Sequence, residues 1–351
     1  MKKAMIAMSG GVDSSVAAHI VFQKYDCIGA TMKLYREETD ENSCCTSNDI
    51  DDAESVAKKL GMPFYVFDCS DNFKRQVISR FVESYCNGKT PNPCIDCNRF
   101  IKFSQLMDEA KNLNADYVVT GHYAIVEYDE ERKRYILRKS TDITKDQSYV
   151  LYSLTQEQLA HILFPLGSMT KAQVRQIAEE QGFINADKHD SQDICFVPDG
   201  DYAGFIERWC GLKFDEGDFV DTNGNFIAKH KGIINYTVGQ RRGLGVAAKA
   251  PYYVVRKEID TNRVVLGSNE DLFSTSLVAT DVNFISVEKL TEPMNVKAKV
   301  RYRQKETDAV IIPLPNGDVK VDFKEAQRAI ASGQAVVFYD GDMVVGGGTI
   351  I

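Results

Sequence analysis

The chain lacks any apolar run that could cross a bilayer. No apolar stretch approaches the roughly 20 residues that a transmembrane helix needs. Five apolar residues separate Met1-Lys2-Lys3 from Ser9, which is fewer than the apolar core of a signal peptide. We therefore expect a cytoplasmic protein without a membrane partner.

An excess of positive charge is absent as well. The 42 Lys and Arg residues are outnumbered by 50 Asp and Glu, which gives a formal net charge of −8. This balance weighs against indiscriminate binding of polyanions but leaves room for a local basic face.

Nine cysteines without an export signal are expected to be thiols. Cys27, Cys69, Cys86 and Cys210 stand in apolar or mixed contexts and are expected to behave as small hydrophobes.

The first third of the chain alternates short apolar runs with helical patterns, which is typical of a doubly wound parallel α/β sheet. Strands are expected at 3–8, 27–33, 63–67 and 116–120, and helices near 49–60, 71–87, 101–112, 155–163, 170–181 and 201–209. A charged hairpin is expected over 124–138. Glycines and strand formers follow residue 211, and from about 275 the pattern predicts a small β-barrel. We expect an α/β domain over 1–200, a small middle domain over 201–274 and a barrel over 275–351.

A glycine loop follows the first expected strand. Residues 9–15 read Ser-Gly-Gly-Val-Asp-Ser-Ser, so a strand, a glycine turn and a helix start succeed one another. The glycines let the backbone approach an anion, the helix start offers N–H groups, and the serines add hydroxyl donors. Asp13 can orient Mg²⁺ or a donor. A tight turn without a ligand is the plainer alternative, but this order of elements favours phosphate binding. No Gly-Lys-Ser/Thr follows, so the loop is not a Walker loop.

Two cysteines open a later helix after a pair of prolines. Residues 90–97 read Thr-Pro-Asn-Pro-Cys-Ile-Asp-Cys, and a third thiol, Cys195, stands in a short apolar run. The helix start and Arg99 both favour the thiolate of a cysteine placed there. A Cys-x-x-Cys pair serves redox, zinc or iron–sulfur sites, or is simply two buried thiols beside a turn. Zinc needs a fourth ligand, and His122, Cys44 and Cys45 have no recognisable spacing for it.

A basic face is predicted near the C-terminal end. Residues 296–303 read Val-Lys-Ala-Lys-Val-Arg-Tyr-Arg, and the strand period of two puts the cations on one face and Tyr302 on the core face. The cations are Lys297, Lys299, Arg301 and Arg303. Edge lysines also guard against aggregation, but the two arginines favour phosphate contact. A second basic cluster at 132–139 is equally well explained by a solvated hairpin. Gln240-Arg241-Arg242 lies in a glycine-rich loop that can fit closely against RNA.

From end to end the chain resembles the bacterial tRNA-specific 2-thiouridylases, which belong to the PP-loop ATP pyrophosphatases. The matching motifs are Met8–Ser15, Thr90–Pro93 with Cys97-Asn98, Gly121-His122-Tyr123, Lys145–Tyr149, Ile194-Cys195-Phe196, Val238–Gly245, Arg301–Gln304, and Gly333-Gln334 with Phe338-Tyr339. Seven or more motifs in the family's order are far more specific than the glycine loop alone. The resemblance implies that ATP, with Mg²⁺, activates the wobble uridine of tRNA, and that sulfur then replaces its 2-oxygen.

The resemblance also implies roles for individual residues. Cys97 would be the nucleophilic thiol, and Cys195 would bear a persulfide supplied by a cysteine desulfurase or a sulfur-carrier protein. Cleaving the persulfide S–S bond needs a second thiol, which explains the pair. ATP would contact Ala7, Met8, Ser9, Gly10, Gly11, Val12, Asp13, Ser14, Met32 and Gly121. The tRNA would contact Cys94, Ile95, Asp96, His122, Lys145, Asp146, Gln147, Arg301, Tyr302 and Gln334.

The chain departs from the family pattern at Cys94, where many members carry an aspartate with an acid–base role. Asp96 points elsewhere if the segment is extended. Cys94, Cys97 and Cys195 also resemble the ligand set of related tRNA thiolases that hold a [4Fe–4S] cluster, so the persulfide and cluster routes both stay open. Rival functions are a PP-loop synthetase acting on a small molecule and a non-catalytic RNA-binding protein. The oligomeric state is left open.

Overall fold

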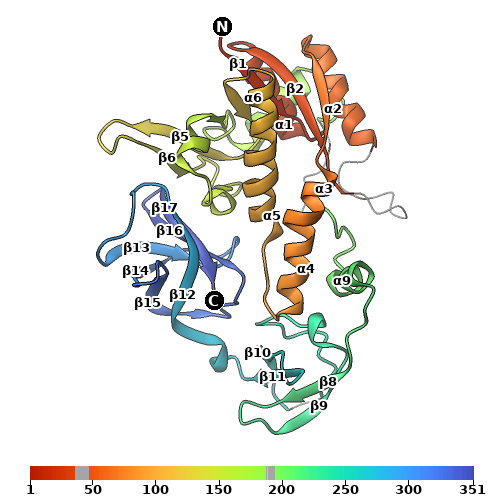
Figure 1. Cartoon of the computed structure of the whole chain (residues 1–351), viewed down its shortest axis with the longest axis vertical. Coiled ribbons are helices and arrows are strands. Elements are labelled where there is room, and N and C mark those ends of the chain that lie inside the picture. The colour runs from red at the N-terminus through yellow and green to blue at the C-terminus, as the bar shows by residue number, and fades with distance from the viewer. Residues whose placement is uncertain (36–46, 187, 189–193, 248) are drawn as a thin grey trace.

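Three sheets organise the molecule. The computed structural model describes residues 1–35, 47–186, 188, 194–247 and 249–351. A five-stranded parallel sheet forms in the N-terminal part, a four-stranded sheet in the middle part and a closed barrel in the C-terminal part (Figure 1). The predicted fold class, a doubly wound sheet followed by a small middle domain and a barrel, is confirmed. Within the described ranges, no helix combines the length and apolarity that spanning a membrane requires.

The parallel sheet has the order β3-β2-β1-β4-β7 and is covered by helices on both faces. Its strands are β1 (Lys3–Ala7), β2 (Asp26–Lys33), β3 (Phe64–Asp68), β4 (Tyr117–Val119) and β7 (Ile162–Leu163). Ala4 and Ile6 of β1 pack with helices α1 (Val12–Phe22), α2 (Ser47–Leu60) and α8 (Lys171–Glu180). Met5, on the opposite face of β1, packs with α6 (Leu106–Asn112). Burial on two faces explains the uninterrupted apolar run of this strand.

The helix predicted near 155–163 is wrong in its second half. A capping box of Thr155 and Gln158 starts α7 (Gln156–Ala160), and His161 ends it. Residues Ile162–Leu163 instead form β7, because buried Ile162 completes the edge of the sheet beside β4. The next helix, α8, begins at the predicted cap, Thr170.

Two long helical segments run from the parallel sheet toward the other two parts (Figure 1). One comprises α3 (Ser70–Phe73), a π-helical stretch (Lys74–Ile78) and α4 (Ser79–Cys86), as predicted for 71–87. The other comprises α5 (Pro93–Asp96), a π-helical stretch (Cys97–Gln105) and α6, so it begins earlier than the predicted 101–112. The reason is local: Pro93 occupies the first turn, and the Asn92 side chain accepts a hydrogen bond from Cys94 N at 3.1 Å.

The four-stranded sheet of the middle part shares its core with α4. Its order is β10-β11-β8-β9, and its strands are β8 (Gly217–Val220), β9 (Phe226–His230), β10 (Tyr253–Glu258) and β11 (Arg263–Gly267). Phe81 of α4 belongs to the same apolar cluster as Phe219 of β8, and its ring lies 6.2 Å from Tyr202 at the start of α9 (Tyr202–Cys210). The middle part is therefore joined to the α/β part by a continuous core.

Six strands form the barrel. They are β12 (Phe273–Phe284), β13 (Met294–Lys299), β14 (Thr307–Pro313), β15 (Val319–Arg328), β16 (Ala335–Asp340) and β17 (Met343–Ile350). Pairing of β12 with β17 closes it, and Gly346 permits the closure because a Cβ there would lie 2.3 Å from the Asn283 carbonyl oxygen. The predicted hairpin, β5 (Ala124–Asp129) and β6 (Arg134–Lys139), extends the barrel sheet where Arg138 pairs with Met343.

The strand predicted over 296–303 is too long. β13 ends at Lys299, and residues 301–304 form a turn. The chain must reverse here because β14 returns from Thr307 to pair with β13. Val296, Ala298 and Val300 do face the barrel core, but Tyr302 is 37% exposed and does not.

Candidate active site

The glycine loop packs against the end of β4. Gly10 adopts φ +70°, and a Cβ there would lie 2.3 Å from the Asp49 carbonyl oxygen. Within the loop, Ser9 N donates to the Ser14 hydroxyl at 3.2 Å. Gly121, just beyond β4, lies so close that a Cβ would come within 2.8 Å of Ser14 N. The loop is therefore a tight turn at the carboxyl edge of the sheet, where open α/β sheets bind their ligands.

The other residues expected to contact ATP border the same edge. Ala7 is the last residue of β1, Met8 N donates to Ala30 O at 2.8 Å, and Val12 begins α1. Met32, near the end of β2, packs against two apolar clusters, one of which holds Cys97. The structure brings these residues to one edge, and their contact with ATP stays a prediction.

Two lysines that were not predicted as site residues from the sequence contact the loop. Both come from the last third of the α/β part. Lys171 Nζ lies 2.7 Å from Asp13 Oδ1 and 2.9 Å from Asp13 Oδ2. Lys188 Nζ donates to Gly10 O at 3.3 Å and pairs with Asp49 at 2.6 Å. No sequence spacing connects these lysines with the loop. The one sequence feature that bears on Lys171 is the helix cap at Thr170, which predicts that Lys171 lies in the first turn of α8.

Asp13 orients a donor in this structure. Besides Lys171, it accepts a hydrogen bond from the Tyr123 hydroxyl at 2.7 Å. Its carboxylate is thus engaged by two donors from different elements, which fits the expected donor-orienting role better than that of a dedicated Mg²⁺ ligand. Mg²⁺ is therefore expected to arrive bound to ATP.

Cys97 and Cys195 both contribute to one large apolar cluster. Cys97 is the first residue of the π-helical stretch and is 9% exposed. Cys195 is half-buried and packs against the same cluster, which also includes Leu34, just after β2. The two segments therefore contribute to one cluster, whereas the approach of the two thiols to each other and sulfur transfer between them stay predictions.

Cys94 lies on the exposed side of the same helix start. It is near Tyr302, whose pKa is raised by burial first and then by the nearby charges of Asp146 and Cys94. Among the residues that the structure describes, no three His, Cys, Asp or Glu side chains are arranged to hold a metal ion. The three cysteines as placed here therefore do not fit a [4Fe–4S] cluster or zinc. Cys44 and Cys45 lie outside the described residues.

Asp96, directly before Cys97, is partly buried, with 19% of its side chain exposed. The segment is helical and not extended, and the carboxylate turns toward Arg80, whose Nε lies 3.6 Å from Asp96 Oδ2. Burial raises the pKa of Asp96 to about 6, against the opposing effect of Arg80 and Arg99. Arg99 in turn forms an ion pair with Asp281 of β12, with Nη2 3.2 Å from Oδ1. A carboxyl with this pKa can hold or release a proton near neutral pH.

Segments that the resemblance assigns to tRNA meet between the barrel and the α/β part. The Tyr302 hydroxyl donates to Asp146 O at 3.0 Å. Gln334 Nε2 donates to Thr90 O at 2.7 Å, just ahead of the Cys-x-x-Cys pair. Arg301 Nη2 donates to Val238 O at 3.2 Å and to Ala329 O at 2.8 Å, so it joins the middle part to the barrel. Lys145 and Gln147, on either side of Asp146, are half-buried. The barrel thus touches the 145–147 segment and the loop before Cys94 at once.

Three of the residues expected to contact tRNA are largely buried, namely Ile95, His122 and Asp146. The His122 ring lies between Phe103 and Phe164, with centroids 5.7 and 5.6 Å away. Burial lowers the pKa of His122 well below its usual value, so the imidazole is neutral. The Asp146 carboxylate accepts from the Ser148 hydroxyl at 2.7 Å. These side chains hold the surrounding loops in shape, and their direct contact with tRNA stays a prediction.

The two basic regions differ in how far their charges are compensated. Lys297, Arg303 and Lys305 are exposed around the end of β13. In the hairpin cluster, Arg138 pairs with Glu127 and Asp342 at 2.6 and 2.7 Å, and Lys139 pairs with Glu306. The structure therefore favours the barrel residues over the hairpin as a phosphate-facing surface.

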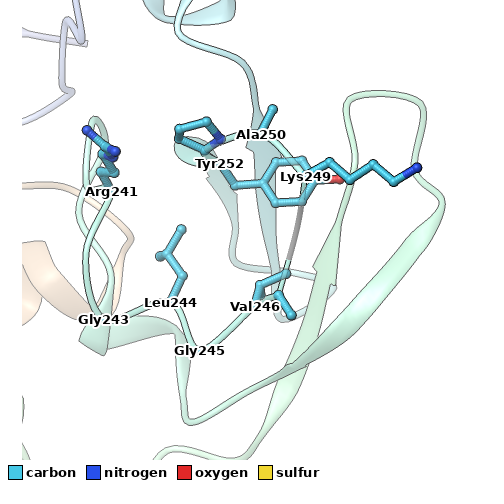
Figure 2. Close-up of a pocket in the computed structure, with 10 residues that line it drawn as sticks. Arg241, Gly243, Leu244, Gly245, Val246, Lys249, Ala250 and Tyr252 are labelled. Carbon is cyan, nitrogen blue, oxygen red and sulfur yellow. The ribbon is translucent and has the colours of Figure 1, made fainter.

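A groove in the middle part lies beside the predicted Gln240–Arg242 loop. The cavity has a volume of about 640 Å³. It is lined by Arg241, Gly243, Leu244, Gly245, Val246, Ala247, Lys249, Ala250, Pro251 and Tyr252. Figure 2 shows Arg241 on one side and Lys249 on the other, with Leu244 between them. Gly243 and Gly245 adopt φ of +76° and +68°, so the loop curls around the groove. Cations at the rim of a curled loop suit a phosphate backbone, and RNA contact here stays a prediction.

Comparison with known proteins covers all three parts. Family models described as "tRNA methyl transferase HUP domain", "tRNA methyl transferase PRC-barrel domain" and "Aminomethyltransferase beta-barrel domain" match residues 2–199, 204–268 and 274–350. The tRNA-specific 2-thiouridylase MnmA of Acetivibrio thermocellus is 55% identical and covers 99% of each chain. The MnmA of Clostridioides difficile is 51% identical, covering 99% of this chain and 98% of its own.

Solved structures are more distant. The U34-tRNA thiolase NcsA from Methanococcus maripaludis, with its [4Fe–4S] cluster, is 17% identical, with a TM-score of 0.35. It covers 59% of this chain and 66% of its own, a likeness too low to bear on function. The descriptions of the family models refer to methyl transfer, whereas the full-length relatives are 2-thiouridylases, and identity of 55% over the whole chain is the more specific match. On that identity and coverage, the chain belongs to the family of tRNA-specific 2-thiouridylases.

Proposed function

We propose that this enzyme uses ATP to replace the 2-oxygen of the wobble uridine of tRNA with sulfur. The observation that supports the proposal is that Cys97 and Cys195, from distant segments, contribute to one apolar cluster that also holds Leu34, just after β2. Met32 and Leu34, at the end of β2, join that cluster to the edge where the glycine loop lies. The expected nucleotide site and the two thiols thus border one cluster, an arrangement that suits coupled activation and sulfur transfer.

The first step activates an oxygen that is otherwise a poor leaving group. With N3 deprotonated, the uridine 2-oxygen attacks the α-phosphorus of ATP, and pyrophosphate leaves with its Mg²⁺. The glycine loop supplies backbone N–H groups and the Ser9 and Ser14 hydroxyls to the phosphates. The product is a uridine esterified with AMP at the 2-position, and AMP can now depart in place of oxide.

The second step delivers sulfur from a persulfide on Cys195. Its terminal sulfur attacks C2 of the activated uridine, and AMP leaves with the 2-oxygen. The Cys97 thiolate then attacks the Cys195 sulfur and breaks the S–S bond, which leaves sulfur on C2 and a Cys97–Cys195 disulfide. A thiol reductant returns the disulfide to two thiols. A cysteine desulfurase or a sulfur-carrier protein supplies the next persulfide. No step passes through an iron–sulfur cluster, because the described thiols do not fit one.

Pyrophosphate release tests this function against its rivals. We expect release from ATP to require a tRNA with uridine at the wobble position and to fail with the same tRNA carrying cytidine there. Release without tRNA would indicate a synthetase acting on a small molecule. Binding of tRNA with no release under any condition would indicate a non-catalytic RNA-binding protein.

A further inference from the structure

Lys171 and Asp13 form an ion pair at the glycine loop in which the lysine is nearly enclosed and the Asp13 side chain is 31% exposed. Lys171 is the first residue of α8, its side chain is 11% exposed, and Nζ lies 2.7 and 2.9 Å from the two oxygens of Asp13. The Tyr123 hydroxyl donates to Asp13 Oδ1 at 2.7 Å, and Lys171 N donates to Asp142 Oδ2 at 3.0 Å. Hydrogen bonds therefore hold Lys171 in place at both its backbone nitrogen and its side-chain ammonium.

Packing of the two helices does not explain this pair. Val16 and Ala17 of α1 already share an apolar cluster with Val174 and Ala178 of α8. Removing two charges from water costs several kcal/mol, so an apolar contact would join the helices at least as well. An ammonium withdrawn from water in such a position points to a use for the charge itself.

The charge has a use in the loop. Asp13 lies in the first turn of α1, where the phosphates of ATP are expected, and an uncompensated carboxylate there would repel a polyphosphate. A Walker loop carries its own lysine, whereas residues 9–15 contain none. Lys188 pairs with two carboxylates, Asp49 and Asp52, at 2.6 and 3.0 Å, so its charge is more than cancelled outside the loop.

We infer that Lys171 is the cation of the pyrophosphate site: it cancels the charge of Asp13 and presents ammonium protons to the β- and γ-phosphates of ATP. Asp13 and Tyr123 are positioning residues that hold the ammonium at the loop before ATP arrives. The inference deepens the proposed function, since it names the group that balances the leaving pyrophosphate.

Binding of inorganic pyrophosphate to the full chain, measured by calorimetry with EDTA and no tRNA, tests this. We expect Lys171→Met to weaken binding on the order of 10- to 100-fold, the range of a charge-assisted hydrogen bond, and Lys171→Arg to restore most of it. Asp13→Asn, which keeps an oxygen that can accept from the ammonium, should tighten binding several-fold, because no carboxylate then repels the phosphates. Adding Asp13→Asn to Lys171→Met should recover several-fold, because no unpaired carboxylate then faces the phosphates.

Lys139→Met is the matched control, since Lys139 is 12% exposed and pairs with Glu306 away from the loop, and its pyrophosphate affinity should not change. Affinity within two-fold of the unaltered protein in Lys171→Met, or loss of binding in Asp13→Asn, would overturn the inference. If Lys171→Met does not fold, the pyrophosphate affinity of Asp13→Asn decides the question. Because the assay contains no tRNA, it separates the two proposals. Unchanged pyrophosphate affinity in Lys171→Met would not contradict thiolation, and a lack of thiolation would not alter the expected pyrophosphate affinities.

Discussion

At the scale of single residues, the two thiols differ in accessibility. Cys195 is half-buried, whereas Cys97 is 9% exposed and lies under the start of its helix. A sulfur-donor protein can therefore approach Cys195 more easily, and Cys97 is suited to attack a sulfur that has already been delivered. This asymmetry agrees with the order of steps proposed for the pair.

Serine variants separate the two roles. Cys97→Ser and Cys195→Ser should each lose thiolation while keeping tRNA affinity within about two-fold, because neither change alters a charge or a large side chain. After incubation with a cysteine desulfurase, mass spectrometry of Cys97→Ser should detect persulfide on Cys195. Cys27→Ala, in the core of the parallel sheet, should retain thiolation. Normal thiolation in either serine variant would contradict the mechanism.

A buried amine limits stability at the junction of α4 and the middle sheet. Lys257 Nζ has no hydrogen-bond partner among the described residues, and it lies 5.7 Å from the Tyr85 ring centroid. Burial lowers the pKa of Lys257 to about 8. Between pH 8 and 10.5 the unfolded chain binds more protons than the folded one, so stability should rise with pH across that window.

Lys257→Met removes that cost. At pH 7 the amine is mostly protonated in the folded state and fully protonated in the unfolded state, so the variant should be more stable by about 2 to 3 kcal/mol, and its dependence on pH between 8 and 10.5 should be flatter. Urea unfolding at several pH values measures both effects. Lys231→Met, at an exposed position nearby in the middle part, should change neither. A less stable Lys257→Met at pH 7 would show that the amine is compensated in the folded state.

At the scale of elements, prediction succeeded where local chemistry decides. The loop at 9–15, the cap at Thr170 and the four longer strands of the parallel sheet follow from short patterns, and each forms where expected. The pieces that were missed depend on distant partners. β7 exists because β4 offers an edge, and β13 stops at Lys299 because β14 must return to it. Lys171 contacts Asp13 although the two residues are 158 positions apart in the chain, and no spacing in the sequence predicts that contact.

The turn after β13 carries a test of tRNA contact. Arg301→Ala should weaken tRNA binding and reduce the slope of log affinity against log salt by about 0.7 to 0.9, the value of one phosphate contact. The carbonyls of Val238 and Ala329 hold the guanidinium in place while its remaining N–H donors are available to a phosphate. Filter binding at several salt concentrations measures the slope. Arg256→Ala, whose arginine pairs with Glu258, is the control. Weaker binding with an unchanged slope would mean that Arg301 only clamps the middle part to the barrel.

At the scale of the whole molecule, the barrel supports the helix that carries Cys97. Thr90 N donates to Ser332 O at 2.8 Å, and Asn283 Nδ2 donates to Tyr152 O at 2.7 Å. Asp281 of β12 pairs with Arg99, two residues after Cys97. Figure 1 shows the barrel beside the α5 end of the long helical segment. The barrel, which is proposed to bind tRNA, is thus in direct contact with the helix that carries the proposed catalytic Cys97.

Breaking the Asp281–Arg99 pair tests that continuity. Asp281 has φ +49°, a conformation that asparagine also tolerates, so Asp281→Asn removes the charge without straining the backbone. Both side chains are more than a third exposed, so the effect should be modest: the turnover rate of thiolation should fall a few-fold, with tRNA affinity unchanged. Single-turnover kinetics with saturating tRNA measure the rate. Asp308→Asn, on an exposed position of β14, removes the same charge from the barrel without touching Arg99 and should keep the full rate. Equal rates in both variants would mean that the barrel recruits tRNA without positioning Cys97, whereas a slow Asp281→Asn with normal affinity ties the position of the barrel to the chemistry at the thiol.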